Sequence, residues 1–146
     1  MKVDDQHSGM TRRATYRVMI VIALAITGGR IAVVTSREGD TAFLSANDRS
    51  RWCTVASLVE DGTYAIDRQV AITHPQYRHR HPWGTIDKVQ HLGSDGQQHF
   101  YSSKPPLLPT LIAGVYKAVN VVTGMTLTDQ PIYVARILLA LVNLPL

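Results

Sequence analysis

The chain has a single cysteine and none of the short motifs that bind nucleotide phosphates or activate a serine nucleophile. Because Cys53 has no second cysteine to pair with, an intramolecular disulfide and a CxxC metal site are both excluded. A lone cysteine is most often a small structural hydrophobic residue. A glycine-rich phosphate loop, a GxSxG elbow and a Ser/His/Asp pattern are also missing. The sequence therefore gives no support for thiol, serine or P-loop chemistry.

The chain also lacks a concentrated basic surface, although its formal net charge is +4. Residues 37–104 hold eight basic and eight acidic side chains, so the excess positive charge lies outside this segment. Part of it lies at Arg12, Arg13 and Arg17, just before an apolar run, where positive residues are typical of the cytoplasmic flank of a membrane helix. Since no basic stripe with interleaved aromatic residues is present, we expect no nucleic-acid partner.

Zinc-site spacings are missing too, despite a polar segment rich in histidine. The five histidines of this segment are His74, His79, His81, His91 and His99. None of them forms an HxxxH or HExxH pattern, and acidic residues are not clustered with them. We therefore assign no metal ligand and interpret the run at residues 78–81 as solvated.

Three apolar runs are the main feature that is present: Val18–Thr35, Leu107–Leu127 and Ile132–Leu146. The first is close to the length that a membrane span needs. Arg30 interrupts it, and a charge at a helix centre costs about 2.5–3.5 kcal/mol on insertion scales, but Arg30 lies past the middle and can reach the outer face. Cleavage of a signal sequence near Ala25–Gly29, releasing a secreted protein, is the alternative. We favour an uncleaved helix.

These runs predict a mainly α, multi-pass membrane protein with two to three transmembrane helices and one extracytoplasmic loop. The expected segments are a cytoplasmic tail at 1–17, transmembrane helices at 18–36 and 105–124, the loop at 37–104 and the start of a third transmembrane helix at 130–146. The N-terminus is then cytoplasmic, and the chain lies in a cell membrane, such as a bacterial inner membrane. The shortness of the third run leads us to expect the front end of a larger protein.

The loop is expected to contain a short helix and a β-hairpin. Over Asn47–Glu60 the apolar residues recur at helical spacing, Asn47 or Asp48 can cap the start, and Gly62 can end the helix. This helix is expected to lie along the membrane surface. Segments 85–92 and 98–103 flank the turn signal Gly93-Ser94-Asp95-Gly96, which predicts a hairpin. Residues 63–72 favour extended structure.

Three charged residues are candidates for chemistry. Asp48, close after the first helix, can act as a general base or help to hold a divalent cation, or it can simply cap the short helix. Lys104 precedes two prolines that fix the backbone, and its ammonium group can pair with a phosphate or simply reach the membrane interface. Arg136 lies within the third apolar run, where a charge is a functional candidate by default, or it lies at the cytoplasmic interface.

Taken together, these motifs resemble the N-terminal part of integral-membrane glycosyltransferases with the C-type fold. The nearest group is family 39, which includes dolichyl-phosphate-mannose protein mannosyltransferases and bacterial aminoarabinose transferases. Asn47-Asp48 stands where such enzymes have Asp-Glu, with Trp52 near an aromatic position and Gly62 at a following glycine. The run Lys104-Pro105-Pro106-Leu107 matches a Lys-Pro-Pro-Leu motif, and Ala135-Arg136 matches an Ala-Arg pair.

The resemblance implies transfer of a sugar from a polyprenyl-phosphate donor to an extracytoplasmic acceptor, with the lipid bilayer and the donor as partners. It makes Asp48 the catalytic residue, since Asn47 replaces the first acid of the pair, and it makes Lys104, Asn47 and Arg136 substrate-binding. We expect this chain by itself to be inactive, because so few helices cannot enclose a lipid-phosphate cavity. The alternative is a non-catalytic, membrane-anchored envelope protein whose loop binds another protein.

Overall fold

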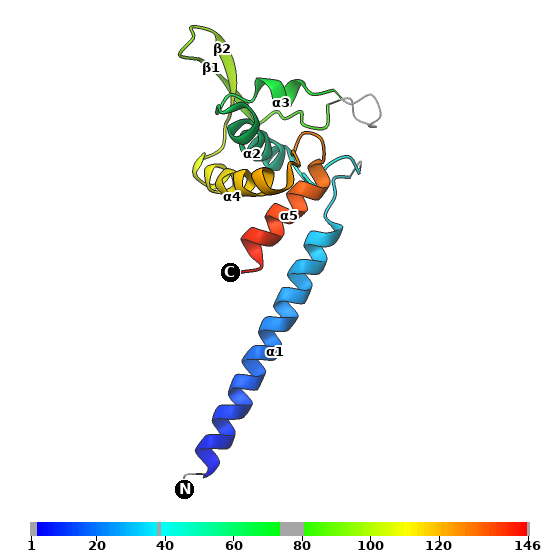
Figure 1. The fold of residues 1–146 in the computed structure, drawn as a ribbon, viewed down its shortest axis with the longest axis vertical. Coiled ribbons are helices and arrows are strands. Elements are labelled where there is room, and N and C mark those ends of the chain that lie inside the picture. Colours follow the sequence, from blue (N-terminus) through cyan, green and yellow to red (C-terminus); the bar gives the residue numbers. More distant parts are fainter. Residues whose placement is uncertain (1–2, 38, 74–80, 146) are drawn as a thin grey trace.

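The computed structural model describes residues 3–37, 39–73 and 81–145, with side chains described from Arg12 onward. Most of the described chain is helical, and two strands form one small antiparallel sheet (Figure 1). This confirms the mainly α class and the hairpin. The elements in chain order are α1 (Val3–Val33), α2 (Ala46–Ala56), the π-helical turn η1 (Ser57–Asp61), α3 (Asp67–Ala71), β1 (Lys88–Leu92), β2 (Gln98–Ser102), α4 (Leu107–Thr123) and α5 (Pro131–Asn143).

Helix α1 projects far from the rest of the molecule (Figure 1). It begins at Val3, so it extends through much of the segment that the sequence assigned to a cytoplasmic tail. Within the described residues, Arg12–Val33 is the one stretch long and apolar enough to cross a membrane, and none of it is buried in the protein. A signal sequence near an N-terminus meets the same criteria. Arg30 lies in the last turn, where the helix dipole favours a positive charge.

Helix α2 is capped by Ser45, not by Asn47 or Asp48 as the sequence suggested. The Ser45 hydroxyl accepts a hydrogen bond from the Asp48 N–H and donates one to the Asp48 carboxylate, at 3.2 and 2.9 Å. This reciprocal arrangement resembles a capping box, which satisfies helix N–H groups that have no partner within the helix. The helix continues into η1 and ends at Gly62, whose φ of 70° is the left-handed conformation that favours glycine.

The segment after Gly62 is extended only at its start. Ala65 forms an isolated bridge with Tyr101, and the chain then turns into α3, so the expectation of extended structure over residues 63–72 is wrong for most of that range. Asp67, in the first turn of α3, accepts a hydrogen bond from the Phe100 N–H at 2.9 Å. This contact joins α3 to β2, and tertiary bonding of this kind overrides local strand preference.

The β1–β2 hairpin agrees with its predicted position. Lys88 pairs with Ser102 and Leu92 with Gln98, and the turn between them contains Gly96 with a φ of 77°. After the hairpin, Pro106 caps α4, which ends at Gly124 with a φ of 71°, and Pro131 begins α5. These bounds lie within three residues of those expected for the second and third apolar helices.

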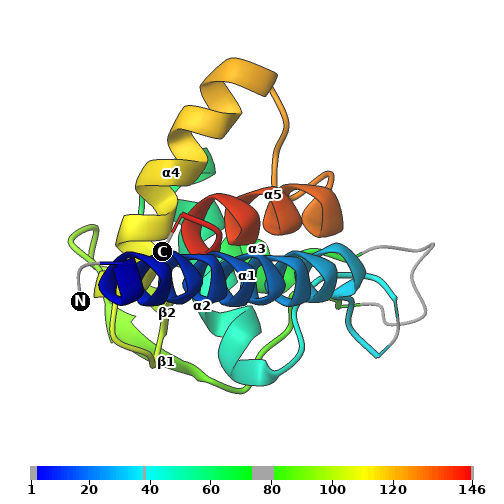
Figure 2. The ribbon, with the colours of Figure 1, turned by 90° about the horizontal axis from the view of Figure 1, so that it is seen from below.

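Helices α4 and α5 run in different directions relative to α1. In both views α4 runs across the long axis of α1, whereas α5 runs back alongside the C-terminal end of α1 (Figures 1 and 2). Arg136 of α5 donates two hydrogen bonds to the Val34 carbonyl, which lies just after α1. The N-terminal half of α5 therefore lies beside the C-terminal end of α1.

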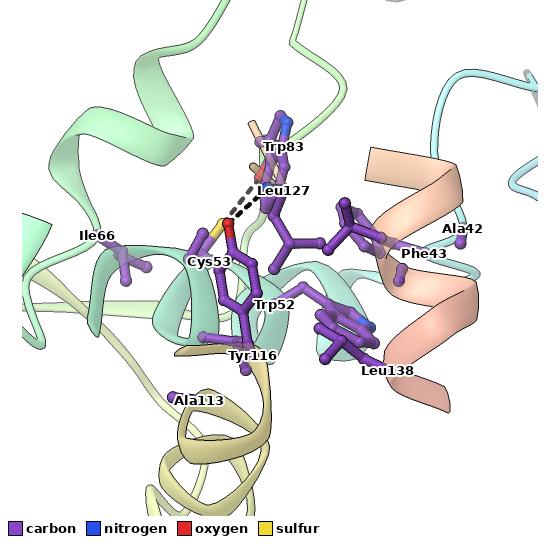
Figure 3. Packing of buried hydrophobic residues seen from close by; sticks show 14 residues of the cluster. Ala42, Phe43, Trp52, Cys53, Ile66, Trp83, Ala113, Tyr116, Leu127 and Leu138 are labelled. Atoms are coloured by element: carbon purple, nitrogen blue, oxygen red, sulfur yellow. Dashed lines mark hydrogen bonds between the residues drawn. The ribbon is translucent and has the colours of Figure 1, made fainter. Parts of the chain in front are cut away.

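Aromatic side chains form the centre of the core around α2 (Figure 3). The rings of Phe43 and Trp52 stack with centroids 5.5 Å apart, and Phe43 meets Trp83 edge-on at 4.8 Å. Offset and edge-to-face pairs are the favoured geometries of aromatic rings. Helix α2 packs against α4 through Tyr116, and α5 contributes Leu138, so one core holds α2, α4 and α5 together.

Candidate functional site

Lys104 lies three residues before the first residue of α4, beside a shallow cavity. The cavity has a volume of about 210 Å³ and is lined by Thr54, Tyr64, Tyr101, Ser102, Lys104 and Pro106. The Lys104 ammonium forms an ion pair with Asp87 at 3.2 Å, and each side chain is about one quarter exposed. The backbone N–H of Lys104 donates to the Ser102 hydroxyl at 3.1 Å. Lys104 is therefore fixed at the cavity wall rather than extended into solvent.

A hydroxyl network holds the Asp87 side of this site. The Ser50 hydroxyl of α2 donates to the Asp87 carbonyl and lies 2.6 Å from the Ser102 hydroxyl. Sequence analysis did not identify Ser50 or Asp87. The hairpin register offers a signal for Asp87, because the pairing of Lys88 with Ser102 places residue 87 beside residue 103. Nothing local in the sequence marks Ser50.

Asp48 and Asn47 lie at the start of α2. The Asp48 side chain is partly buried and bound to Ser45, whereas Asn47 is exposed. Among the described residues, no hydrogen bond or ion pair joins either of them to Lys104. The structure thus shows Asp48 as part of a helix cap, and the acidic and basic candidates as separate groups. Ser50 provides an indirect connection between Asp48 and Lys104. It follows Asp48 by two positions in α2, and its hydroxyl bonds the backbone carbonyl of Asp87, whose carboxylate pairs with Lys104.

Arg136 has a structural partner. Its Nε and Nη2 donate to the Val34 carbonyl oxygen at 3.1 and 2.9 Å. Val34 follows the last residue of α1, where the final carbonyl groups of a helix have no intrahelical partner. The guanidinium therefore gives this carbonyl at the end of α1 a hydrogen-bond partner and holds α5 against α1.

Glu60, which the sequence interpretation treated only as the end of a helix, is a hub of buried hydrogen bonds. Its side chain is only 7% exposed. Its carboxylate accepts hydrogen bonds from the Tyr116 hydroxyl at 2.7 Å, the Leu127 N–H at 3.1 Å, the Thr128 N–H at 3.3 Å and the Thr128 hydroxyl at 2.5 Å. A π-helical turn is uncommon and often marks a functional or strained place. Here the turn presents Glu60 to the connection between α4 and α5.

His99 lies at a second cavity, between two carboxylates. Its Nε2 lies 2.9 Å from Asp95 and its Nδ1 lies 2.8 Å from Asp67. Hydrogen bonding to Asp95, and then to Asp67, raises the pKa of His99. The hydrogen bond from the Gln97 N–H, and then the one from His99, lower the pKa of Asp95.

Within the described part of the chain, no group of three or more metal-ligating side chains is placed to hold an ion. His74 and His79 lie outside the described residues. His91 packs edge-on against Tyr101, with ring centroids 6.4 Å apart. The histidine-rich segment thus contributes one ion-paired residue and one ring contact to the described structure.

Comparison of this chain with protein-family models, with curated proteins and with solved structures finds no match.

Proposed function

We propose that this chain is the membrane-anchored front end of a polyprenyl-phosphate glycosyltransferase, and that Lys104 binds the phosphate of the lipid-linked donor. In this proposal α1 crosses a cell membrane with its N-terminus in the cytoplasm, and residues 37–104 are extracytoplasmic. The observation that carries the proposal is the Lys104 cavity, which opens at the start of the apolar helix α4. A lipid phosphate lies at the same boundary between apolar and aqueous surroundings.

The chemistry of the cavity suits a phosphate monoester or diester. The Lys104 ammonium is a compact positive charge with three donors, and such groups pair with phosphate oxygens. Tyr64 and Tyr101 supply rings and hydroxyls at the wall, which fit the junction between a polar head group and a hydrocarbon chain. Asp87 already balances the charge of Lys104, so an incoming phosphate must share or displace this carboxylate.

Asp48 is proposed as the acidic residue for acceptor activation. Its side chain is partly exposed, and it lies two positions before Ser50, the serine that bonds the Asp87 backbone carbonyl. A general base must reach the proton that it removes within hydrogen-bonding distance. Asn47 and Arg136 are the remaining proposed substrate contacts, and Asn47 is the more accessible of the two. A divalent cation would need ligands beyond Asp48.

A second candidate is a non-catalytic membrane-anchored envelope protein whose loop binds another protein. One observation favours it: Asp48, Lys104 and Arg136 each have an internal partner, namely Ser45, Asp87 and Val34. In this case the three charges stabilise the fold and no donor lipid is bound.

Lipid binding by purified chain in nanodiscs separates the two candidates. Phosphorus NMR of a polyprenyl phosphate, titrated against the protein, reports binding by line broadening. We expect Lys104→Ala to abolish the broadening and Lys104→Arg to keep most of it. Lys88→Ala is the matched control, because Lys88 lies over the Phe100 ring of the hairpin, 4.2 Å from the ring centroid, and does not line the cavity. Equal broadening by the wild-type and Lys104→Ala proteins would rule out the phosphate role.

A further inference from the structure

We propose that α4 does not cross the bilayer but lies flat on its outer surface, with one apolar face in the lipid. The partner is the boundary between the head groups and the acyl chains of a membrane. This inference rests on the proposal that α1 spans the membrane, because α1 defines the direction of the membrane normal. It is otherwise independent of the phosphate site at Lys104.

The two faces of α4 have different surroundings. One face is buried against α2, through Pro109, Ala113 and Tyr116. The opposite face is exposed and apolar over the full length of the helix. It consists of Leu107, Leu111, Gly114, Ala118, Val121 and Val122. The larger of these side chains are 63–84% exposed, and such a continuous apolar surface marks an interaction site.

Both ends of α4 are attached to the same polar part of the molecule. At its N-terminal end, Lys104 is paired with Asp87 beside the hairpin. At its C-terminal end, Glu60 bonds Leu127 and Thr128 in the α4–α5 connection. A helix that crossed the bilayer would have these two ends on opposite sides. With 17 residues, α4 is about 25 Å long, so a shared polar anchor at both ends excludes a crossing in this fold.

The exposed face is on the side of the molecule from which α1 emerges. Figure 1 shows α4 below α2, with α5 and the C-terminal end lower still, and the view from below in Figure 2 has α4, α5 and α1 in front of α2 and α3. In the apolar stretch of α1, Arg12–Val33, no residue is buried in the protein. One bilayer, perpendicular to α1, accounts for the exposed side chains of both helices.

The flanking residues fit a lipid surface better than a protein partner. Lys117 is exposed and lies beside the apolar face, one turn from Gly114. A lysine in this position can extend its ammonium to lipid phosphates while its methylene groups remain in the apolar layer. Amphipathic helices of this kind enter the head-group region by roughly 5–10 Å.

Depth measurements on single fluorophores test the inference. An environment-sensitive dye is attached to Leu107→Cys, Gly114→Cys and Val122→Cys proteins in lipid vesicles. An added Cβ at Gly114 meets nothing within 4 Å, so this substitution is tolerated. Native Cys53 is fully buried and serves as the unlabelled background. Quenching by nitroxides placed at the head group or deep in the acyl chains gives the depth of each dye.

Ile22→Cys in α1 and Ile86→Cys in the loop are the controls, and both positions are exposed, at 52% and 89%. We expect the three α4 dyes to have the same shallow depth, Ile22→Cys to be deep and Ile86→Cys to remain unquenched. A deep dye at position 114 between two shallow ones would show that α4 crosses the bilayer. Three unquenched α4 dyes would show that protein or water covers this face, which also overturns the inference.

The controls distinguish failure of this inference from failure of the proposed membrane anchor. If the dye at position 22 is unquenched while the α4 dyes are shallow, α1 is not a span but α4 still binds lipid. If position 22 is deep and the α4 dyes are not shallow, α1 is a span and only the placement of α4 is wrong.

Discussion

Tyr116 of α4 donates its hydroxyl to the Glu60 carboxylate at 2.7 Å and accepts the Leu127 N–H at the same distance of 2.7 Å. These bonds connect three segments that lie far apart in the sequence. The Leu127 N–H also donates to the Glu60 carboxylate at 3.1 Å, so the tyrosine and the carboxylate share this buried backbone group. The position of α4 therefore depends on a carboxylate in the π-helical turn, not on α4 alone.

Removal of the Glu60 carboxylate should destabilise the fold. Glu60→Ala leaves the Tyr116 hydroxyl and the Thr128 donors without this acceptor, and an unsatisfied buried polar group costs about 1–3 kcal/mol. We expect a loss of about 3 kcal/mol in the free energy of unfolding, measured by denaturant titration in detergent. Glu60→Gln, which keeps one oxygen acceptor, should lose less.

Fluorescence provides the readout for this series, since Trp52 and Trp83 are both buried in the core. Tyr116→Phe is a useful companion variant because it removes one hydroxyl and keeps the ring. If Glu60→Ala unfolds at the same denaturant concentration as the wild type, the hub has no stabilising role.

Replacing the side chain of Phe43 by a methyl group should reduce the free energy of unfolding at least as much as Glu60→Ala does. Phe43 is fully buried between Trp52 and Trp83, and Phe→Ala in a core typically costs 3–5 kcal/mol. We expect Phe43→Ala to lower the free energy of unfolding by about 4 kcal/mol. Ile86→Ala, at a side chain 89% exposed, is the control and should change it little. Similar losses in both variants would contradict the assignment of this core.

The thiol of Cys53 should be unreactive in the folded protein. Burial raises the pKa of Cys53 to about 12, and the thiolate is the reactive form. At pH 8 we expect a maleimide to label the chain only after denaturation. Because the folded state disfavours the thiolate, ionisation of the unfolded thiol should also lower stability as the pH rises above the usual value of about 9. Rapid native labelling would mean that α2 opens.

The attachment of the hairpin tip to α3 should depend on pH. Contacts with Asp95 and Asp67 raise the pKa of His99 above its ordinary value of 6.5. The stabilisation is therefore complete below pH 6.5 and is lost as the pH rises through the elevated pKa. Proton NMR of the imidazole should show a raised pKa that falls in Asp95→Asn and, separately, in Asp67→Asn. A pKa at or below 6.5 in the wild type would mean that these contacts do not persist in solution.

Loss of the Asp87 charge should strengthen phosphate binding at Lys104. Asp87 lies 3.2 Å from the ammonium and repels an incoming phosphate. We expect Asp87→Asn to bind polyprenyl phosphate more tightly than the wild type in the same phosphorus NMR titration. Asp95→Asn, on the hairpin turn, is the charge-matched control. Weaker binding by Asp87→Asn would mean that Asp87 positions Lys104 instead of competing for it.

Local signals in the sequence predicted much of the fold. Gly62 and Gly124 end helices in left-handed conformations, Pro131 begins α5, and the turn at residues 93–96 gives the hairpin. The apolar spacing of Trp52, Val55 and Ala56 correctly indicated a helix, and the structure buries these residues in the core. Each of these features depends on residues close together in the chain, which is why sequence analysis detects them.

The orientation of α4 and the partners of the charged residues could not be predicted in this way. Glu60 bonds the connection after α4 and Asp87 pairs with Lys104 before it, and contacts of this kind between separate segments leave no local signal in the sequence. The partner of Arg136 is a backbone carbonyl, which has no signature in the sequence. For Asp48, the sequence correctly placed the residue near the start of a helix. The residue that caps this helix is, however, Ser45.

The bond between Arg136 and Val34 also constrains when the protein can fold during synthesis. It joins residues 102 positions apart, and the Glu60–Thr128 contact joins residues 68 apart. Contacts between distant residues form late because a long loop must close first. The ribosome must therefore synthesise the chain through α5 before α5 reaches its place, and until then the aromatic core is partly open. During that interval the nascent chain exposes the surface that chaperones recognise.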